Sequence, residues 1–213
     1  MKIMKRGIFI TVEGVEGVGK TTAIRVITDY ILHHSNHHVV ATREPGGTLF
    51  CEKIRDLFTK DSEEPIHSDT EVLLLFASRN QHIQKLILPA LENNQWVICD
   101  RYFDATHAYQ VASGVSPERI KTIEDWMTDL PLPDLTFYLD APISVCLERL
   151  NNRKSKDRIE ARSMKYFSTV RQNYLNRAKE NPDRFCIISA DCDIKEVHAN
   201  IQSKLADILN EYA

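Results

Sequence analysis

The amino-acid sequence predicts an α/β protein in which helices flank a five-stranded parallel sheet. Five short apolar runs rich in β-branched residues are separated by stretches with helical periodicity. The runs are apolar almost throughout, which is typical of strands buried on both faces of a parallel sheet. A Gly-rich segment joins the first run to a helical pattern. The five predicted strands are residues 8–12, 38–42, 96–99, 135–139 and 185–189.

The chain of 213 residues has the size of one large domain, so we expect a single domain over residues 1–213. Its 27 Lys and Arg against 30 Asp and Glu give a net charge of −3. That balance argues against a nucleic-acid-binding protein that works through a general basic field.

The five cysteines are odd in number and scattered, without a C-x-x-C pair, which favours reduced thiols and a cytoplasmic location. The basic N-terminal segment resembles the start of a signal peptide. However, Glu13 closes the apolar stretch behind it after about six residues, which is too short for a signal peptide or a membrane span.

The first predicted strand leads into Gly-Val-Glu-Gly-Val-Gly-Lys-Thr at residues 14–21, which matches the phosphate-binding pattern G-x-x-x-x-G-K-[ST]. Glycines allow a concave loop whose N–H groups face phosphate oxygens, Lys20 adds a positive charge, and Thr21 offers a hydroxyl to Mg²⁺. A helix predicted to start at Thr22 favours anions at its N-terminus. The alternative is a strand-to-helix turn that is Gly-rich by chance.

The second predicted strand ends at Arg43, before the turn Glu44-Pro45-Gly46-Gly47. Pro45 restricts Glu44 to an extended conformation, and the glycines permit positive φ. Such a stiff turn could hold the Arg43 guanidinium still for bidentate phosphate binding. Alternatively, Arg43 is a surface residue before an ordinary turn.

The third predicted strand ends in Asp100 and Arg101. The carboxyl ends of parallel strands meet at one edge of the sheet, where ligands bind. Asp100 would therefore lie near Thr21 and hold Mg²⁺ through water, while Arg101 would face a second phosphate. The alternative role for Asp100 is to cap the next helix.

Two helical faces could accept a ring-shaped ligand. Phe76 and Arg79 are i, i+3 neighbours, and Thr106, Tyr109 and Gln110 share one face at i, i+3 and i+4. Phe76 alone would also fit an ordinary core position. The histidines of residues 33–38 could suggest a metal, but their turn spacing favours a solvated loop.

Residues 149–158 carry five basic side chains in ten, from Arg149 to Arg158. Two interpretations stay open. The segment is either a solvated charge run or a short basic lid, about residues 149–160, that closes positive charge over phosphates.

Together, the segments F-I-T-V-E-G-V-E-G-V-G-K-T-T, T-R-E-P-G-G-T, C-D-R-Y-F-D-A-T-H-A-Y-Q, P-D-L-T-F-Y-L-D and D-R-I-E resemble the thymidylate kinase family. The resemblance covers nearly the whole chain in order. It implies a P-loop kinase fold and phosphorylation of dTMP to dTDP with ATP and Mg²⁺. It also implies a homodimer.

The resemblance assigns residues to dTMP. Arg43 and Arg101 would grip its phosphate, and Glu16 would meet the 3′-hydroxyl of the sugar. Phe76 would stack on thymine, and Arg79 would donate to a base carbonyl.

Three further residues would complete the dTMP site. Tyr109 would lie against the deoxyribose, where a 2′-hydroxyl would need space. Thr106 and Gln110 would stand at the polar edge of the base.

On the donor side, Arg149 would lie near adenine, while Thr21 and Asp100 would serve Mg²⁺. The ATP phosphates would be held by the loop and the start of the helix, namely Gly14, Val15, Glu16, Gly17, Val18, Gly19, Lys20, Thr21 and Thr22.

The loop has no basic residue between Gly14 and Gly19, which resembles the bacterial-type subgroup that supplies its catalytic arginine from the lid. Arg153 is then the first candidate and Arg158 the second. The chain departs from many relatives at residues 111–114, which are poorer in glycine, and at Asn151 and Asn152, where some relatives have arginine.

The predicted reaction needs no general base, because the dTMP phosphate is mostly dianionic at neutral pH. Catalysis would rest on positioning and charge stabilisation by Lys20, Arg43, Arg101, Arg153 and Mg²⁺. A kinase for another nucleotide or deoxynucleoside is the alternative among enzymes. A nucleotide-dependent switch protein would share the loop but would normally carry N-K-x-D, which this sequence lacks.

Overall fold

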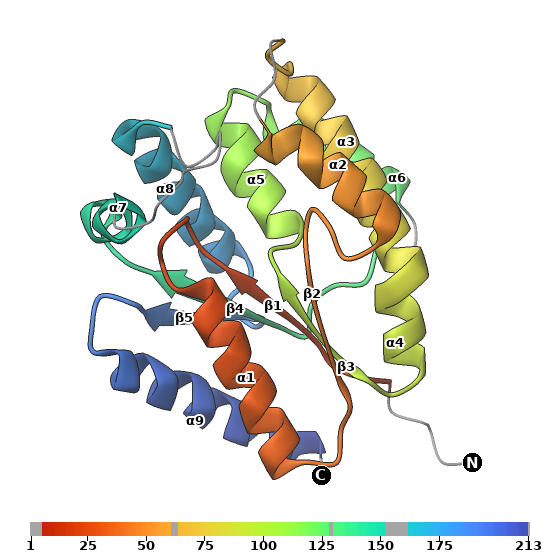
Figure 1. Ribbon diagram of the computed structural model, residues 1–213, viewed down its shortest axis with the longest axis vertical. Helices are drawn as coiled ribbons and strands as arrows, with labels where there is room; N and C mark the ends of the chain where they lie inside the picture. Colours follow the sequence, from red (N-terminus) through yellow and green to blue (C-terminus); the bar gives the residue numbers. More distant parts are fainter. Residues whose placement is uncertain (1–5, 61–63, 128–129, 152–161, 213) are drawn as a thin grey trace.

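In the computed structural model, five parallel strands form one sheet in the order β2-β3-β1-β4-β5 (Figure 1). The structure describes residues 6–60, 64–127, 130–151 and 162–212. All five predicted strands are confirmed, and the prediction of a parallel α/β sheet is correct. The strands are β1 (Phe9–Glu13), β2 (Val39–Arg43), β3 (Trp96–Asp100), β4 (Leu135–Asp140) and β5 (Phe185–Ser189).

Helices cover both faces of this sheet (Figure 1). Within the described residues they are α1 (Lys20–His34), α2 (Leu49–Thr59), α3 (Ser68–His82), the π-helical turn η1 (Ile83–Ile87), α4 (Leu88–Glu92), α5 (Phe103–Ala112), α6 (Pro117–Trp126), α7 (Ile143–Asn151), α8 (Met164–Glu180) and α9 (Ile194–Tyr212). No helix in the described part of the chain is long and apolar enough to cross a membrane.

The core lies on both sides of the central strand β1. Ile10 packs in a cluster with Ile27 of α1, whereas its neighbour Phe9 packs in a second cluster with Ile87. Side chains alternate between the two faces of a strand, so a strand buried on both sides is apolar at most positions. Helices α1 and α9 pack side by side in front of the sheet in Figure 1, and α8 packs against α5 and the strands β4 and β5.

Four strands end in a charged residue at the same edge of the sheet. These residues are Glu13, Arg43, Asp100 and Asp140. Arg43 pairs in register with Asp100, and Val12 pairs with Asp100 from the other side. The topology thus brings charged residues from distant parts of the sequence to one rim.

Candidate active site

The Gly-rich loop turns sharply between β1 and α1. Gly17 has a φ of 77°, and a Cβ there would collide with the backbone carbonyl oxygen of Cys146, so only glycine fits. Helix α1 begins at Lys20, two residues before the predicted Thr22, with Gly19 as its N-cap. No side chain caps this helix, so its first N–H groups are available to an anion.

Lys20 folds back over the loop. Its Nζ donates hydrogen bonds of 3.0 Å to the carbonyl oxygens of Gly14 and Val15. Burial and the neighbouring Arg101 lower the pKa of Lys20 to about 8. This cation lies close to the positive charge of Arg101 and has no carboxylate in direct contact within the described residues, as expected of a group that receives an anionic ligand.

Arg101, Glu16 and Tyr109 form a compact cluster beside the loop. Glu16 accepts from Arg101 Nη2 at 2.9 Å and from the Tyr109 hydroxyl at 2.6 Å. The Arg101 guanidinium lies 4.6 Å from the centre of the Tyr109 ring. Burial opposes ionisation of Glu16, but Arg101 and Lys20 outweigh it and lower the pKa of Glu16, so the carboxylate stays charged.

Asp100 and Thr21 suit a magnesium ion. Asp100 Oδ1 is buried and, within the described residues, accepts no hydrogen bond, while Thr21 is exposed in the first turn of α1. Carboxylate and hydroxyl oxygens are ligands that Mg²⁺ accepts. The alternative role for Asp100 is excluded, because the N-cap of α5 is Tyr102 and carries no side-chain cap.

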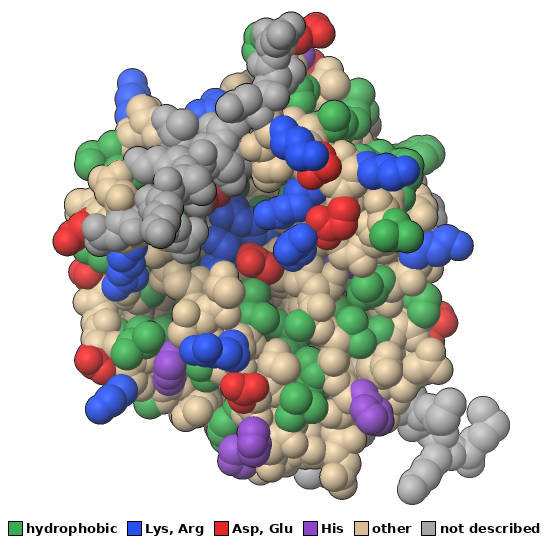
Figure 2. Space-filling model, in the orientation of Figure 1, with side chains coloured by type: hydrophobic (Ala, Val, Ile, Leu, Met, Phe, Trp, Pro, Cys, Tyr) green, Lys and Arg blue, Asp and Glu red, His purple; other side chains and the backbone are tan. Residues whose placement is uncertain are grey.

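A cavity opens next to this cluster, between the loop after β2 and the helices α2, α3, α5 and α8. Its wall consists of Glu16, Glu44, Pro45, Arg55, Phe58, Thr59, Glu71, Leu75, Arg79, Arg101, Tyr102, Ala105, Thr106, Tyr109, Gln110, Arg162 and Tyr166. Figure 2 shows Lys and Arg side chains gathered with acidic ones around a hollow on this face of the molecule. The cavity combines an apolar wall with converging charges, as small-molecule sites do.

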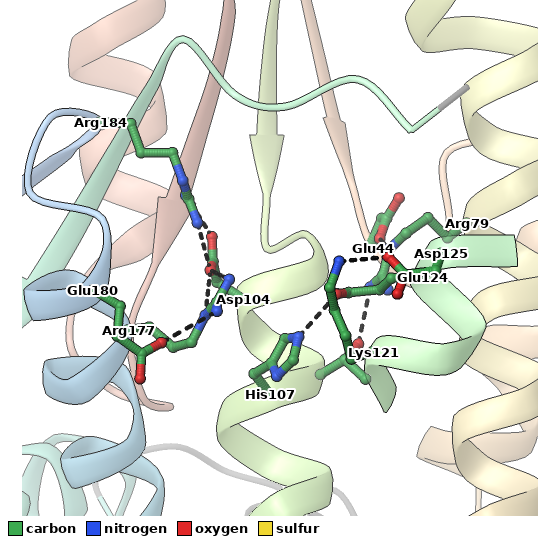
Figure 3. A network of polar contacts seen from close by, with 11 residues as sticks. Glu44, Arg79, Asp104, His107, Lys121, Glu124, Asp125, Arg177, Glu180 and Arg184 are labelled. Atoms are coloured by element: carbon green, nitrogen blue, oxygen red, sulfur yellow. Dashed lines mark hydrogen bonds and ion pairs between the residues drawn. The ribbon is translucent and has the colours of Figure 1, made fainter. Parts of the chain in front are cut away.

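Arg79 crosses the cavity wall and is 2% exposed. Its Nε donates to Glu44 at 2.7 Å, in an ion pair drawn in Figure 3, and its Nη2 donates to Thr106 Oγ1 at 3.0 Å. Nη1 is buried and has no partner among the described residues. A buried donor without an acceptor is costly, so a ligand acceptor at this point would be favourable.

The structure does not bring two predicted residues to the cavity. Phe76, 4% exposed, packs in the core beneath Arg79, whose guanidinium lies 5.0 Å from its ring centre. Leu75, one position earlier on α3, lines the cavity instead. Arg43 is half-exposed and pairs with Glu52 at 3.0 Å.

Arg55 is a cavity residue that the sequence reasoning missed. It lies on α2 and donates from Nη1 to the carbonyl oxygen of Pro45 at 3.0 Å. Burial and the nearby Arg43 lower its pKa from the ordinary value. In the sequence, the position of Arg55 shortly after the Pro-Gly-Gly turn could have indicated that it lies at this cavity. Arg162 and Tyr166, at the start of α8, were also missed.

The remaining predicted acceptor residues meet at this cavity. Thr106 and Gln110 line it from α5 and are both buried, and Gln110 Nε2 lies 3.5 Å from Glu71 Oε2. Arg101, Glu16 and Tyr109 line it as well.

A second cavity adjoins the outer side of the phosphate loop. Gly17, Val18, Gly19 and Thr22 line it together with Arg149, whose Nη2 donates to the carbonyl oxygen of Ala190 at 3.1 Å. Arg149 therefore lies beside the phosphate loop, and its placement near adenine stays a prediction. Arg153 and Arg158 lie outside the described residues.

Comparison with known proteins decides the family. The family model described as thymidylate kinase matches residues 12–201, from the end of β1 into α9. The chain belongs to the thymidylate kinase family. A thymidylate kinase of Vesicomyosocius okutanii is 44% identical over 200 residues, which cover 93% of this chain and 97% of the relative. The thymidylate kinase of Nitrosospira multiformis is 42% identical over 204 residues, covering 95% and 98%.

A solved thymidylate kinase has the same fold. The crystal structure of the enzyme from Ehrlichia chaffeensis superposes with a TM-score of 0.74 at 30% identity, covering 96% of this chain and 99% of that one. As a member of this family, the chain phosphorylates dTMP in nucleotide biosynthesis, with ATP as the phosphate donor and Mg²⁺. The alternatives of another substrate or a switch protein are not favoured.

Proposed function

We propose that dTMP binds in the cavity lined by Arg79, Thr106 and Arg101, with thymine at the Arg79 end and the phosphate at the Arg101 end. The observation that carries this assignment is Arg79 Nη1, a buried donor without a partner in the described part of the protein. A thymine carbonyl supplies the missing acceptor. Leu75, rather than Phe76, offers the base an apolar contact.

Three arginines contribute positive charge at the phosphate end of the proposed site. Arg55 and Arg101 line the cavity, and Arg43 lies close enough to lower the pKa of Arg55. Guanidinium groups match phosphate geometry and stay charged. To contact the acceptor phosphate, Arg43 must therefore break its ion pair with Glu52. Otherwise it acts on the phosphate only through its longer-range electrostatic field.

The sugar lies between these ends, against Glu16 and Tyr109. Their 2.6 Å hydrogen bond fixes the Tyr109 ring beside the deoxyribose ring of dTMP. Glu16 keeps a charged oxygen for the 3′-hydroxyl, and the Tyr109 ring leaves no room for a 2′-hydroxyl.

ATP binds from the opposite side of the loop. Its phosphates lie against the N–H groups between Gly14 and Thr22, and its base enters the cavity that Arg149 lines. Thr21 and Asp100 would hold Mg²⁺, and the ion would supply charge neutralisation for phosphoryl transfer. Lys20 exchanges its two carbonyl contacts for phosphate oxygens.

The acceptor oxygen needs no general base, because a phosphate monoester is mostly dianionic at neutral pH. Glu16 suits this mechanism, since its lowered pKa makes it a weak base. Lys20, Arg101 and an arginine of the predicted lid, first Arg153 and then Arg158, position the two polyanions and stabilise charge. The lid, about residues 149–160, belongs to a single domain of residues 1–213.

We also propose a homodimer in the cytoplasm. Large apolar side chains are exposed on the adjacent helices α2 and α3, namely Leu49, Phe50, Leu57 and Leu73. Such a patch favours a protein partner, and a second copy of this chain is the simplest one. All five cysteines are free thiols, as in a reducing compartment.

A coupled assay of ADP release tests the substrate assignment. With ATP and Mg²⁺ fixed, dTMP, dUMP, dCMP, AMP and GMP are compared as acceptors. The proposal expects the highest kcat/KM with dTMP. A higher value with dCMP or AMP would contradict it.

A further inference from the structure

Glu13 joins three parts of the fold behind the active site. It is the last residue of β1 and is fully buried. Its Oε1 accepts the backbone N–H of Tyr102 at 2.7 Å, and its Oε2 accepts the hydroxyl of Tyr174 at 2.7 Å. Tyr102 begins the turn into α5, and Tyr174 lies in the middle of α8. The reaction described above gives this carboxyl group no role.

The turn that Glu13 holds contains Arg101. Arg101 has a φ of 67°, in the left-handed region that a non-glycine residue rarely adopts. Such a conformation is unfavourable for a non-glycine residue and persists only where the surroundings enforce it. The conformation aims the guanidinium at Glu16 and the cavity.

Two hydrogen bonds to the end of β1 enforce this conformation, one on each side of the Arg101 Cα. The N–H of Arg101 donates to the carbonyl oxygen of Val12 at 3.0 Å. The N–H of the next residue, Tyr102, donates to the side chain of Glu13. Consecutive residues of β1 therefore fix consecutive peptide groups of the turn, one through the backbone and one through a carboxyl group.

We propose that Glu13 is a positioning residue that holds Arg101 in its left-handed conformation and so presents it to the acceptor phosphate. The inference rests on the proposed function in one respect, namely that Arg101 binds that phosphate. Tyr174 supports the same turn through Glu13, which links α8 to the acceptor site.

The charged surroundings of Glu13 decide which substitution imitates it. Asp104 faces it from α5, Arg101 from the turn, Lys20 from α1 and the Cys99 thiol from β3. Burial and Asp104 raise the pKa of Glu13 to about 8. Arg177 and Arg184 bind Asp104 at 3.0 and 2.7 Å (Figure 3). Near neutral pH the Glu13 carboxyl is mostly protonated, so glutamine is a close mimic.

Calorimetric titration with dTMP and with thymidine, in the absence of ATP, tests the inference. Thymidine has the base and sugar but no phosphate for Arg101. Glu13→Ala should weaken dTMP binding about tenfold or more, the effect of losing the charge-assisted hydrogen bond between Arg101 and the dTMP phosphate. Thymidine binding should change less than about twofold. Glu13→Gln should restore dTMP binding to within about threefold of the wild type, because it keeps an acceptor for the Tyr102 N–H.

Tyr174→Phe is a second test, because it removes only the hydroxyl that donates to Glu13 and keeps the ring. Tyr138→Phe is its matched control. Tyr138 stacks on Tyr174 with ring centres 5.1 Å apart, but its hydroxyl donates to Asp140, not to Glu13. Tyr174→Phe should weaken dTMP binding about threefold, the effect of one hydrogen bond, without changing thymidine binding. Tyr138→Phe should change neither.

Equal losses for dTMP and thymidine, or wild-type dTMP binding in Glu13→Ala, would overturn the inference. If Glu13→Ala does not fold, unchanged dTMP binding in Tyr174→Phe would overturn it. A wild-type protein that binds thymidine as tightly as dTMP would instead refute the phosphate role of Arg101 in the proposed function, and the inference would fall with it.

Discussion

One carboxylate oxygen of Glu44 binds Arg79, and the other binds His82. The distances are 2.7 Å from Arg79 Nε and 3.0 Å from His82 Nδ1, and all three side chains are nearly inaccessible to solvent. Thr42 completes the chain, with its hydroxyl 2.7 Å from His82 Nε2. Gly47 must be a glycine beside them, because a Cβ would collide with both His82 and Thr42. The motif T-R-E-P-G-G-T thus reaches the base end of the cavity through Glu44.

Tyr109 should control sugar discrimination. Tyr109→Ala removes the ring that its hydrogen bond to Glu16 fixes in place. The ratio of kcat/KM for dTMP to that for ribothymidine monophosphate should fall about tenfold, while binding of both weakens through lost contact area. Steady-state kinetics with both substrates measures the ratio. Tyr109→Phe, which keeps the ring, is the control. A ratio unchanged in Tyr109→Ala would remove the residue from this role.

Glu13 should make the folded state less stable as pH rises. Its pKa is about 8 in the folded protein and 4.5 when unperturbed. Between these values the folded state holds a proton that the unfolded state has lost, so the free energy of unfolding decreases with rising pH. From pH 6 to pH 8 this group should contribute a loss of about 2 kcal/mol. Urea unfolding at both pH values measures it, and Glu13→Gln should lack this part of the change. An equal pH dependence in wild type and variant would contradict the assignment.

Arg153 should act on the transferring phosphoryl group. An arginine in this role is typically worth about 10³–10⁵ in turnover, whereas an exposed charge run contributes about 0–1 kcal/mol. Arg153→Ala should therefore lower kcat at least about a hundredfold, with little change in the Kd for dTMP. Arg119→Ala is the control, since Arg119 is 63% exposed and lies on α6, away from the cavity lining. A kcat within about threefold of wild type would transfer the role to Arg158 or favour the solvated charge run.

Phe50 should contribute to a dimer interface. A charge placed in a buried apolar interface is strongly unfavourable. Phe50→Glu should convert the proposed dimer to a monomer in sedimentation velocity at micromolar concentration. Leu32→Glu is the matched control, because Leu32 is 51% exposed on α1 and Phe50 is 53% exposed on α2. A monomeric wild type would refute the homodimer.

The central strands β1, β3 and β4 could be predicted because burial on both faces makes their sequences mostly apolar. The last residues of β1, β2 and β3 could not, since Glu13, Arg43 and Asp100 are polar yet continue the backbone pairing to the edge of the sheet. The start of α1 was placed two residues late, because Gly19 rather than the end of the loop motif caps the helix.

Residues that follow a strand could be placed at this edge of the sheet from the sequence, whereas residues that depend on helix packing could not. Asp100 and Arg101 follow β3 directly, so parallel topology alone places them. Leu75 and Arg55 face the cavity only because of how α3 and α2 pack together and against the turn at Pro45. Phe76, the aromatic residue next to Leu75 on α3, was the stronger sequence signal for a contact with the base, although it points into the core.

The central claim is that Arg79 reads the thymine base in this cavity, and substrate competition tests it most directly. Cytosine carries an amino group where thymine has its 4-carbonyl, so the free Nη1 donor has no acceptor there. The ratio of kcat/KM for dTMP to that for dCMP should be high in the wild type. It should fall by roughly one to two decades in Arg79→Ala, the effect of losing a buried polar partner worth about 1–3 kcal/mol. An unchanged ratio in the variant would contradict the claim.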